Sequence, residues 1–479
     1  MRTALPTIGL ALTLALPLSG CETPTPDARA SWLQSTLVDD NRILLERVPE
    51  GVADKFRKMA SRPYYYFRGN MRVFIDDTTR PGPGSVPTRF ASGPASRVLL
   101  VGDPHPENLG TYHPGGGVLV FEFNDFDGAM YGPFHQDVRR LALGFAVALS
   151  EAGLDLEESK PVLDAVGAGY VAEIEALRSG GAPIQVVPGA GFGVIVEDLF
   201  RRARRDGRAQ EALDEYTVVA DGARAMFYGQ VERPVDGVIA DRVDPVSPAD
   251  DQLVRSLLAG YPGTLLTAQP SAFFTVKGIS RRLGAGVSSY PLRRFYALVE
   301  GPSPALHDDR LLEIKEVLDP TRGPTRHLSD RAFESNGQRV VETQRRLHAR
   351  PDCDPLLGWS AASPLQVRVR ERTKYQKGID VERIVDRMSA NRWTVEDVAD
   401  LARVAGRLLA RSHAGATTLD GQPGLAPIAD ALGDEGPLFV AETTDFVLQY
   451  LPRTEADYAT FVQLLAEEGP WLGYRPASR

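Results

Sequence analysis

The spacing of apolar residues predicts a chain that is mostly helical at both ends. In residues 31–60, for example, Trp32, Leu33 and Leu37 recur at intervals that place them on one face of a helix. The same spacing of three or four positions predicts four more helices, over residues 134–151, 157–179, 330–349 and 394–416. Each of these helices has one apolar face to bury.

Between these helices the pattern changes to strands. From Phe273 onward apolar and polar residues alternate, and this spacing predicts strands at residues 273–282, 294–300, 310–317 and 365–370. The Pro/Gly-rich residues 231–250 are predicted as loops. We therefore expect an α+β fold with a helical lobe at 31–269, a β-rich lobe at 270–375 and C-terminal helices at 376–479 that pack on the helical lobe.

The N-terminus predicts export. Residues 1–20 carry a single charge, Arg2, followed by an apolar stretch that is too short to span a bilayer and is typical of a signal peptide. The stretch ends in Leu-Ser-Gly-Cys, which resembles a bacterial lipoprotein processing site and makes Cys21 the lipidated residue. Residues 21–30 form a Pro/Thr-rich tether. The alternative is that residues 1–20 remain as an uncleaved membrane anchor. In either case we expect the protein to be exported to the cell envelope.

Composition narrows the class of protein further. The chain has 479 residues, enough for two lobes with sizeable cores. With 54 Lys and Arg against 63 Asp and Glu, the net charge is −9, which argues against a nucleic-acid partner. Cys353 is the only cysteine besides Cys21, so no intramolecular disulfide is expected and Cys353 is predicted to be a packed thiol.

Two apolar strands that end in acidic residues carry the candidate chemistry. Residues 98–101 lead into Gly-Asp-Pro-His-Pro-Glu-Asn, which contains Asp103 and Asn108. The next strand leads into Asn-Asp-Phe-Asp, which begins at Asn124 and contains Asp125. A phosphoryl-transfer site needs a carboxylate that orients the attacking hydroxyl, and an amide and a second carboxylate that hold the metal. The five-residue spacing from Asp103 to Asn108 matches that of a kinase catalytic loop.

These motifs resemble those of two families. Gly-Asp-x-His-x-x-Asn resembles the catalytic loop of aminoglycoside and choline kinases, which have the protein-kinase-like fold, and Asn-Asp-Phe-Asp resembles their metal-binding segment. A bacterial family catalogued as domain of unknown function 2252 is more similar, because it also shares Asp-Val-Arg-Arg-Leu-Ala from Asp137. The resemblance covers roughly residues 50–450. One departure is Val101, where the small-molecule kinases have a histidine.

The second half of the chain has the order of a kinase nucleotide lobe. A strand leads into a turn with Gly284 and Gly286, two strands follow with Lys315 in the second, and a helix carries Glu342. The glycines let backbone N–H groups approach phosphates, Lys315 neutralises phosphate charge and Glu342 holds the lysine, with Glu334 as a competing partner. Since the catalytic loop precedes all of these elements, the order implies a circularly permuted kinase-like fold.

Several residues keep two interpretations. His105 either supports the loop backbone, as in the kinases, or binds metal. Asp127 is either a second metal ligand beside Asn108 and Asp125 or a cap of the next turn. Arg68 contacts a phosphate or forms a structural salt bridge, and Asp137 is expected to contact the catalytic loop.

Three classes of function remain open. The first is a phosphotransferase that uses Mg²⁺ or Mn²⁺ and ATP or another nucleotide, acting on a small-molecule or envelope substrate. The second is a metallophosphoesterase, which also uses Asp-x-His after a strand but needs further histidines, and none of the seven here follows Gly-Asn. The third is an envelope lipoprotein that uses the fold only for binding, which the scarcity of ATP outside the cytoplasm favours. The oligomeric state is left open.

Overall fold

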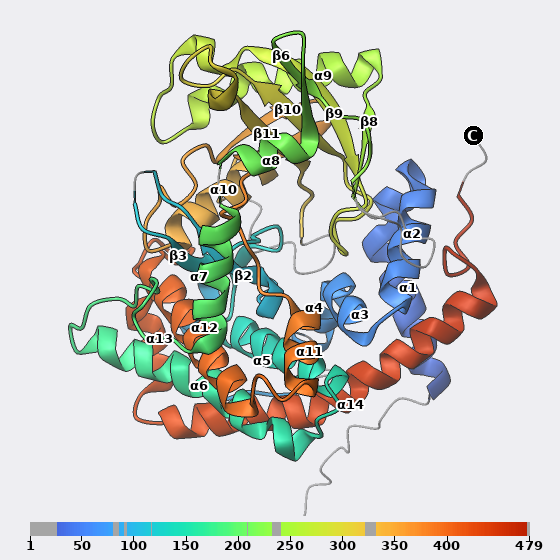
Figure 1. Cartoon of the computed structure of the whole chain (residues 1–479). Helices are drawn as coiled ribbons and strands as arrows, with labels where there is room; N and C mark the ends of the chain where they lie inside the picture. The colour runs from blue at the N-terminus through green and yellow to red at the C-terminus, as the bar shows by residue number, and fades with distance from the viewer. Residues whose placement is uncertain are drawn as a thin grey trace, which may run out of the picture.

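A computed structural model describes residues 26–79, 86–90, 93–115, 117–207, 209–231, 241–320 and 332–476. The fold is α+β, with a large antiparallel sheet above a body of helices (Figure 1). Residues 1–25, which include the predicted signal peptide and Cys21, lie outside the described residues. None of the helices in the described ranges is long and apolar enough to cross a membrane.

The large sheet has seven strands in the order β12-β13-β11-β10-β9-β8-β7. One face is apolar, because residues such as Phe295, Leu312 and Val367 point into a core that helix α9 covers. The opposite face carries charged residues and turns toward the helical body. The elements are β7 (Gly229–Gln230), β8 (Arg242–Pro245), α9 (Pro248–Gly260), β9 (Val276–Leu283), β10 (Arg294–Val299), β11 (Arg310–Glu316), β12 (Gly358–Ala362) and β13 (Leu365–Glu371).

Two features of this sheet correct the sequence analysis. Strand β8 pairs with β9, although residues 231–250 were predicted as loops, and α9 packs on the sheet, although residues up to 269 were assigned to the helical lobe. The boundary at residue 270 is therefore wrong. The cause is the length of β7 and β8, which are too short to show an alternating pattern and are held by backbone pairing and by buried Val243.

The helical body surrounds helix α5, which is buried along almost its whole length. Leu141 and Phe145 of α5 belong to one continuous core with Val166 and Tyr170 of α6 and Leu408 of α12. Helix α10 packs between the sheet and α12. The body consists of α5 (Phe134–Glu151), α6 (Leu156–Arg178), α7 (Val194–Asp206), α10 (Asn336–Leu347), α11 (Val381–Ser389), α12 (Val395–Gly415), α13 (Leu425–Leu432) and α14 (Gly436–Glu468), whereas α8 (Ala209–Tyr216) packs on the large sheet.

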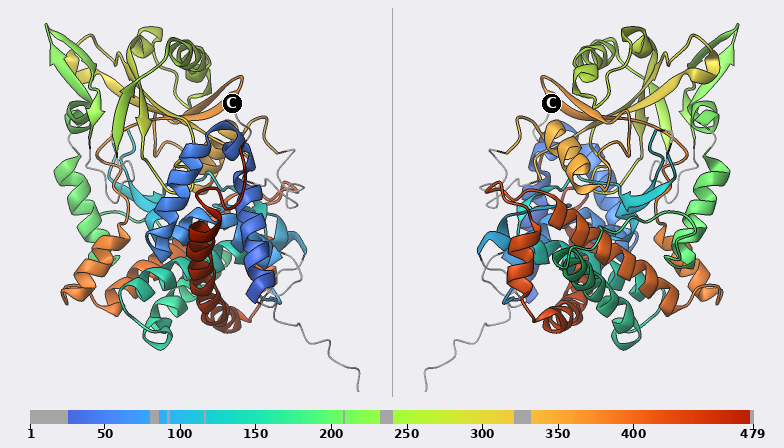
Figure 2. Two further views of the ribbon diagram at one scale, coloured as in Figure 1. Left: turned by 90° about the vertical axis from the view of Figure 1, so that its right-hand side faces the viewer. Right: turned by 90° about the vertical axis from the view of Figure 1, so that its left-hand side faces the viewer.

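The first helices pack against the end of the last one, α14 (Figure 2). Phe56 and Tyr66 contact Phe461 of α14, and Arg29 forms ion pairs with Asp77 and Asp457 at 2.7 and 2.5 Å. The two ends of the described chain are thus brought together at one surface. These helices are α1 (Pro26–Arg47), α2 (Pro49–Ala60), α3 (Pro63–Gly69) and α4 (Met71–Thr79).

Short strands carry the acidic motifs. Strand β1 (Val98–Leu100) pairs with β4 (Met130–Gly132), and β2 (Leu109–Tyr112) pairs with β3 (Val120–Phe123). The two strands that precede the motifs, β1 and β3, therefore belong to separate pairs. A third pair of short strands, β5 (Thr217–Ala220) and β6 (Ala223–Met226), lies beside the large sheet.

Candidate functional site

A cavity of about 350 Å³ lies between the charged face of the sheet and the helical body. Seven of the predicted site residues line it, from segments far apart in the sequence: Asp103, His105, Asn108, Asp125, Asp127, Gly286 and Lys315. Gly284 lines a different cavity beside α2, and Glu342 lines neither of the two. The structure thus brings together most of the predicted site.

The loop that carries Asp103 is fixed by its backbone. Gly102 has a φ of +94°, and a Cβ there would lie 1.9 Å from the carbonyl oxygen of Gly128, so no other residue fits. The backbone N–H groups of Val101 and Gly102 donate to the carboxylate of Asp137, at 2.7 and 3.2 Å. This confirms the expected contact of Asp137 with the loop.

Asp103 points into the cavity with Arg140 behind it. The buried guanidinium of Arg140 donates to Asp103 through Nε at 2.8 Å. Burial raises the pKa of the Asp103 carboxyl, although Arg140 opposes that rise. Asn108 donates through Nδ2 to the carbonyl oxygen of Asp103, at 2.6 Å. The loop therefore holds an oriented carboxylate that binds a proton more readily than an exposed aspartate does.

His105 is packed on aromatic rings. Its ring lies edge-on to Tyr64 and Phe67, with centroids 6.1 and 6.3 Å away, and only 2% of the residue is exposed. Burial, with nearby Arg68, holds the pKa of His105 well below its usual value, so the ring is neutral. These contacts favour the first of its two interpretations, support of the loop. Arg68 forms an ion pair with Glu107 and also lines the cavity.

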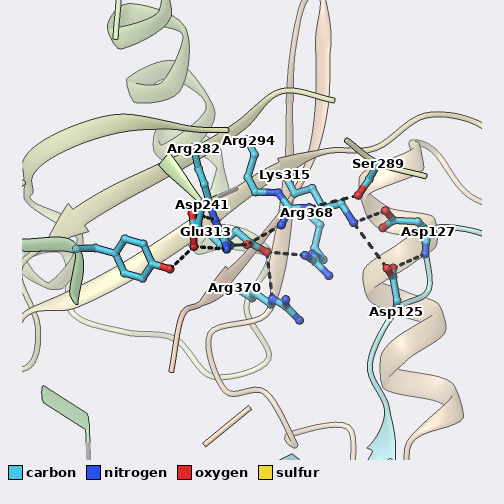
Figure 3. Close-up of polar contacts among 11 residues, drawn as sticks. Asp125, Asp127, Asp241, Arg282, Ser289, Arg294, Glu313, Lys315, Arg368 and Arg370 are labelled. Atoms are coloured by element: carbon cyan, nitrogen blue, oxygen red, sulfur yellow. Dashed lines mark hydrogen bonds and ion pairs between the residues drawn. The ribbon is translucent and has the colours of Figure 1, made fainter. Parts of the chain in front are cut away.

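Asp125 and Asp127 face Lys315 of strand β11 (Figure 3). The Nζ of Lys315 lies 2.5 Å from Oδ2 of Asp127 and 3.8 Å from Oδ2 of Asp125. Burial opposes ionisation of Asp125, but Lys315 and Arg368 outweigh it and hold its pKa below the usual value. The Asn-Asp-Phe-Asp motif therefore meets the predicted phosphate lysine through two carboxylates.

These residues fit a magnesium or manganese ion whose coordination shell is completed by the phosphates of a ligand. The Oδ1 atom of Asp127 is buried and accepts no hydrogen bond, which leaves it available to a cation. No group of three or more His, Cys, Asp and Glu in the described ranges could hold a metal by itself. Mg²⁺ is commonly held by one or two carboxylates, waters and the phosphates of a substrate, which is the donor set available here.

The predicted partner of Lys315 is wrong. Glu342 forms an ion pair with Arg345 at 2.8 Å, and Glu334 is exposed ahead of α10. The residue of α10 that reaches the Asn-Asp-Phe-Asp motif is Arg339, which donates to the carbonyl oxygen of Asp127 at 3.0 Å. A helix was predicted over residues 330–349, but it begins only at Asn336, and its apolar spacing did not specify which polar residue faces the site.

The glycine-rich turn reaches the cavity at Gly286. This residue has a φ of +84°, and its carbonyl oxygen accepts a hydrogen bond from Nζ of Lys58 at 2.9 Å. A Cβ at this position would lie 2.7 Å from Oγ of Ser289. The turn is therefore held between α2 and the sheet, with Val287, Ser288 and Ser289 along the cavity.

Arg140 beside Asp103 and three arginines of the cavity wall were not predicted from the sequence. Arg140 lies in helix α5, whose apolar spacing predicts a buried helix but no functional residue. The role of Arg140 is seen from its ion pair with Asp103. Arg368, Arg370 and Arg372 line the wall formed by β13 and the residue after it. Their signal was their alternation with Val367, Val369 and Glu371, which places all three on one face of a strand.

A buried carboxyl near the cavity predicts a pH dependence. Asp354 is 5% exposed, and burial raises its pKa from 3.8 to about 6. The folded state thus binds the proton more tightly, so this group's contribution to stability falls as pH rises from about 4 to about 6. Relative to the wild type, Asp354→Asn should gain up to about 3 kcal/mol in unfolding free energy between about pH 4 and pH 7. Urea unfolding at each pH measures this difference.

The matched control for this prediction is Asp352→Asn. Its carboxylate is half exposed and pairs with Arg350, so its removal should give no such gain. If the unfolding free energies of Asp354→Asn and the wild type changed in parallel with pH, the raised pKa of Asp354 would be contradicted.

Comparison with known proteins defines the family. The model of a bacterial family described as "Uncharacterized protein conserved in bacteria (DUF2252)" matches residues 47–464, and this chain belongs to that family. The match includes Asp103, Asn108, Asp125 and Lys315. Neither a curated protein nor a solved structure matches the chain.

Proposed function

We propose that this protein is a kinase-like phosphotransferase that transfers a phosphoryl group to a hydroxyl-bearing acceptor. The observation that carries the proposal is the convergence of Asp103, Asn108, Asp125 and Lys315 on one cavity. Phosphoryl transfer requires mainly positioning and charge neutralisation, and these four residues provide both.

Each residue has a defined role in this proposal. Asp103 orients the acceptor hydroxyl and accepts its proton, because its carboxylate is held by Arg140 and has a raised pKa. Lys315 binds the phosphates of the donor. Asn108, Asp125 and Asp127 would hold Mg²⁺ or Mn²⁺, which when bound neutralises phosphate charge. ATP or another nucleotide is the proposed donor.

A circularly permuted kinase-like arrangement explains the order of these elements. Permutation requires that Lys315, late in the chain, meets the early metal motif, and the 3.8 Å between Lys315 and Asp125 supports it. The proximity of α1 and the end of α14 supports it further, because permutation is tolerated where chain ends lie together at a surface.

The proposal is tested by following donors directly. The full chain is incubated with Mg²⁺, hydroxylated small molecules and, in turn, ATP, GTP and inorganic tripolyphosphate, and ³¹P NMR records the phosphate species. We expect Mg²⁺-dependent loss of one donor's terminal phosphate, which Asp125→Asn abolishes. If a donor binds but none is consumed, the protein is a binding module and the transferase proposal fails.

The location is part of the proposal: a protein exported and anchored to the envelope by lipid on Cys21. Cys21→Ser removes the site of lipidation, so the protein should be left unprocessed or released from the membrane. Stable anchoring needs the several acyl chains of a lipoprotein, because one fatty chain binds membranes only weakly. Membrane fractionation and the mass of the mature protein measure this. Unchanged attachment and processing would contradict it.

A metallophosphoesterase is a weaker candidate. In such an enzyme Asp103 and His105 would both bind metal, but His105 packs against Tyr64 and Phe67, with Tyr64 Oη 3.5 Å from its Nδ1. Two-metal sites also need further ligands of this kind. The described part of the chain offers no cluster that could supply them.

A further inference from the structure

The sheet face of the cavity carries an excess of positive charge. Pairing of the strands places Arg294 opposite Lys315 and Lys315 opposite Arg368, so three cations lie side by side across β10, β11 and β13. Two residues further along β13 is Arg370, and Arg372 follows in the same alternation. All five line the cavity.

Few acidic groups compensate these arginines. Glu313 is the carboxylate among them, and it lies 2.8 Å from Arg368, 3.3 Å from Arg294 and 3.4 Å from Arg370 (Figure 3). A fourth arginine, Arg282, also reaches Glu313 but has Asp241 as its own partner, at 2.7 Å. Burial opposes ionisation of Glu313, yet the arginines hold its pKa well below the usual value. Glu313 therefore serves several guanidinium groups, and Asp125 and Asp127 are further carboxylates near Arg368.

Donor groups in this wall lack acceptors. The Nε atom of Arg368 is buried and makes no hydrogen bond, and Nε of Arg370 makes no hydrogen bond beyond its 3.4 Å ion pair with Oε1 of Glu313. Only 3% of the Arg368 side chain and 15% of the Arg370 side chain are exposed. Buried donors normally have partners, and a guanidinium presents its donors in a fork that fits phosphate oxygens. The wall is thus built to receive anionic oxygens.

Arg372 lies at some distance along the sheet from the end of the cavity that contains Lys315. Arg368 lies opposite Lys315, and Arg372 is four residues further along extended chain, which corresponds to about 13 Å. The far end of this row of arginines therefore has room for an anion in addition to the phosphate that Lys315 contacts. A neutral ligand in this space would leave the positive charge of the guanidinium groups without a counter-charge.

We propose that the cavity binds two phosphate-type anions. One lies at Lys315, and the second is bound by Arg370 and Arg372. This inference rests on the proposed function and narrows its substrate class to polyanions. The two anions belong either to one oligophosphate chain that spans the cavity or to two ligands, a donor at Lys315 and a phosphorylated acceptor at Arg372.

Calorimetry with inorganic phosphates tests the proposal and separates the two sources. Tripolyphosphate is titrated into the wild type and into Arg370→Gln/Arg372→Gln without metal, and orthophosphate is titrated into both at saturating pyrophosphate. The double variant should lose about tenfold or more in affinity, because charge-assisted hydrogen bonds are removed. Loss for tripolyphosphate indicates one chain; loss for orthophosphate alone indicates two ligands. Unchanged affinity in both titrations overturns the proposal.

The matched control is Arg281→Gln, an exposed arginine of β9 that does not line the cavity and should bind as the wild type does. If the double variant does not fold, Arg372→Gln alone is used, since Arg372 lines the cavity and lies beyond the end of β13. No turnover is measured, so failure here is distinct from failure of the transferase proposal. A protein that binds both anions but transfers no phosphate contradicts only the latter.

Discussion

Replacing Asp103 by asparagine is expected to lower kcat by about 10²–10⁴-fold, the usual contribution of a positioned general base. The change keeps the size of the side chain and an acceptor for Arg140 Nε, so the loop should keep its structure. Donor affinity should change little, because Asp103 acts only as the phosphoryl group moves. Steady-state kinetics and donor titration measure the two quantities separately.

Lys315→Met provides the contrast, because it removes a ground-state contact and should weaken donor binding. Its matched control is Lys277→Met, a strand lysine paired with Asp309 and Glu300 and outside the cavity. In a phosphoesterase, Asp103→Asn would remove metal and Lys315→Met would have no effect. Donor binding that survives Lys315→Met would contradict the permuted arrangement, even if Asp103 proves catalytic.

Replacing Glu313 by glutamine is expected to lower the free energy of unfolding by about 3–5 kcal/mol, because it leaves buried arginines without their carboxylate. Glu313 is 1% exposed and contacts Arg368 and Arg294. Domains are stable by only about 5–15 kcal/mol, so the variant should be severely weakened. Urea unfolding at neutral pH, in a buffer free of phosphate and sulfate, measures the loss.

Glu342→Gln is the matched control, since its partly exposed pair with Arg345 should contribute about 0–1 kcal/mol. Added tripolyphosphate should restore part of the stability of Glu313→Gln, because ligand binding to the folded state stabilises it. A Glu313→Gln variant as stable as Glu342→Gln would contradict the idea that this carboxylate holds the arginines.

The acidic motifs could be predicted because the residues that carry the candidate chemistry directly follow short apolar strands in the sequence. Asp103 and Asp125 each follow a short apolar strand, so neighbouring residues fix their positions without knowledge of the whole fold. Lys315 was recognisable as a cation within an apolar strand, although its partner was not. A helix shows its apolar face in its sequence, whereas the pairing of a polar residue such as Glu342 depends on which elements pack nearby.

The remaining elements depend on contacts that are distant in sequence. Strand β8 is defined by its pairing with β9, and its four residues give no pattern of their own. Helix α14 contains Pro452 and still runs from Gly436 to Glu468, although proline normally disrupts a helix. Its packing on α5, α6 and α1 stabilises it, and these contacts cannot be inferred from local spacing.

The most direct test of the central claim is a crystal structure with Mn²⁺ and tripolyphosphate, read from the anomalous signal of manganese. We predict Mn²⁺ bound by oxygen atoms of Asn108 and Asp125 or Asp127, at about 2.0–2.2 Å, with a phosphate at Lys315. Manganese at another place, or tripolyphosphate outside the cavity of Asp103 and Lys315, would contradict a phosphoryl-transfer site in this protein.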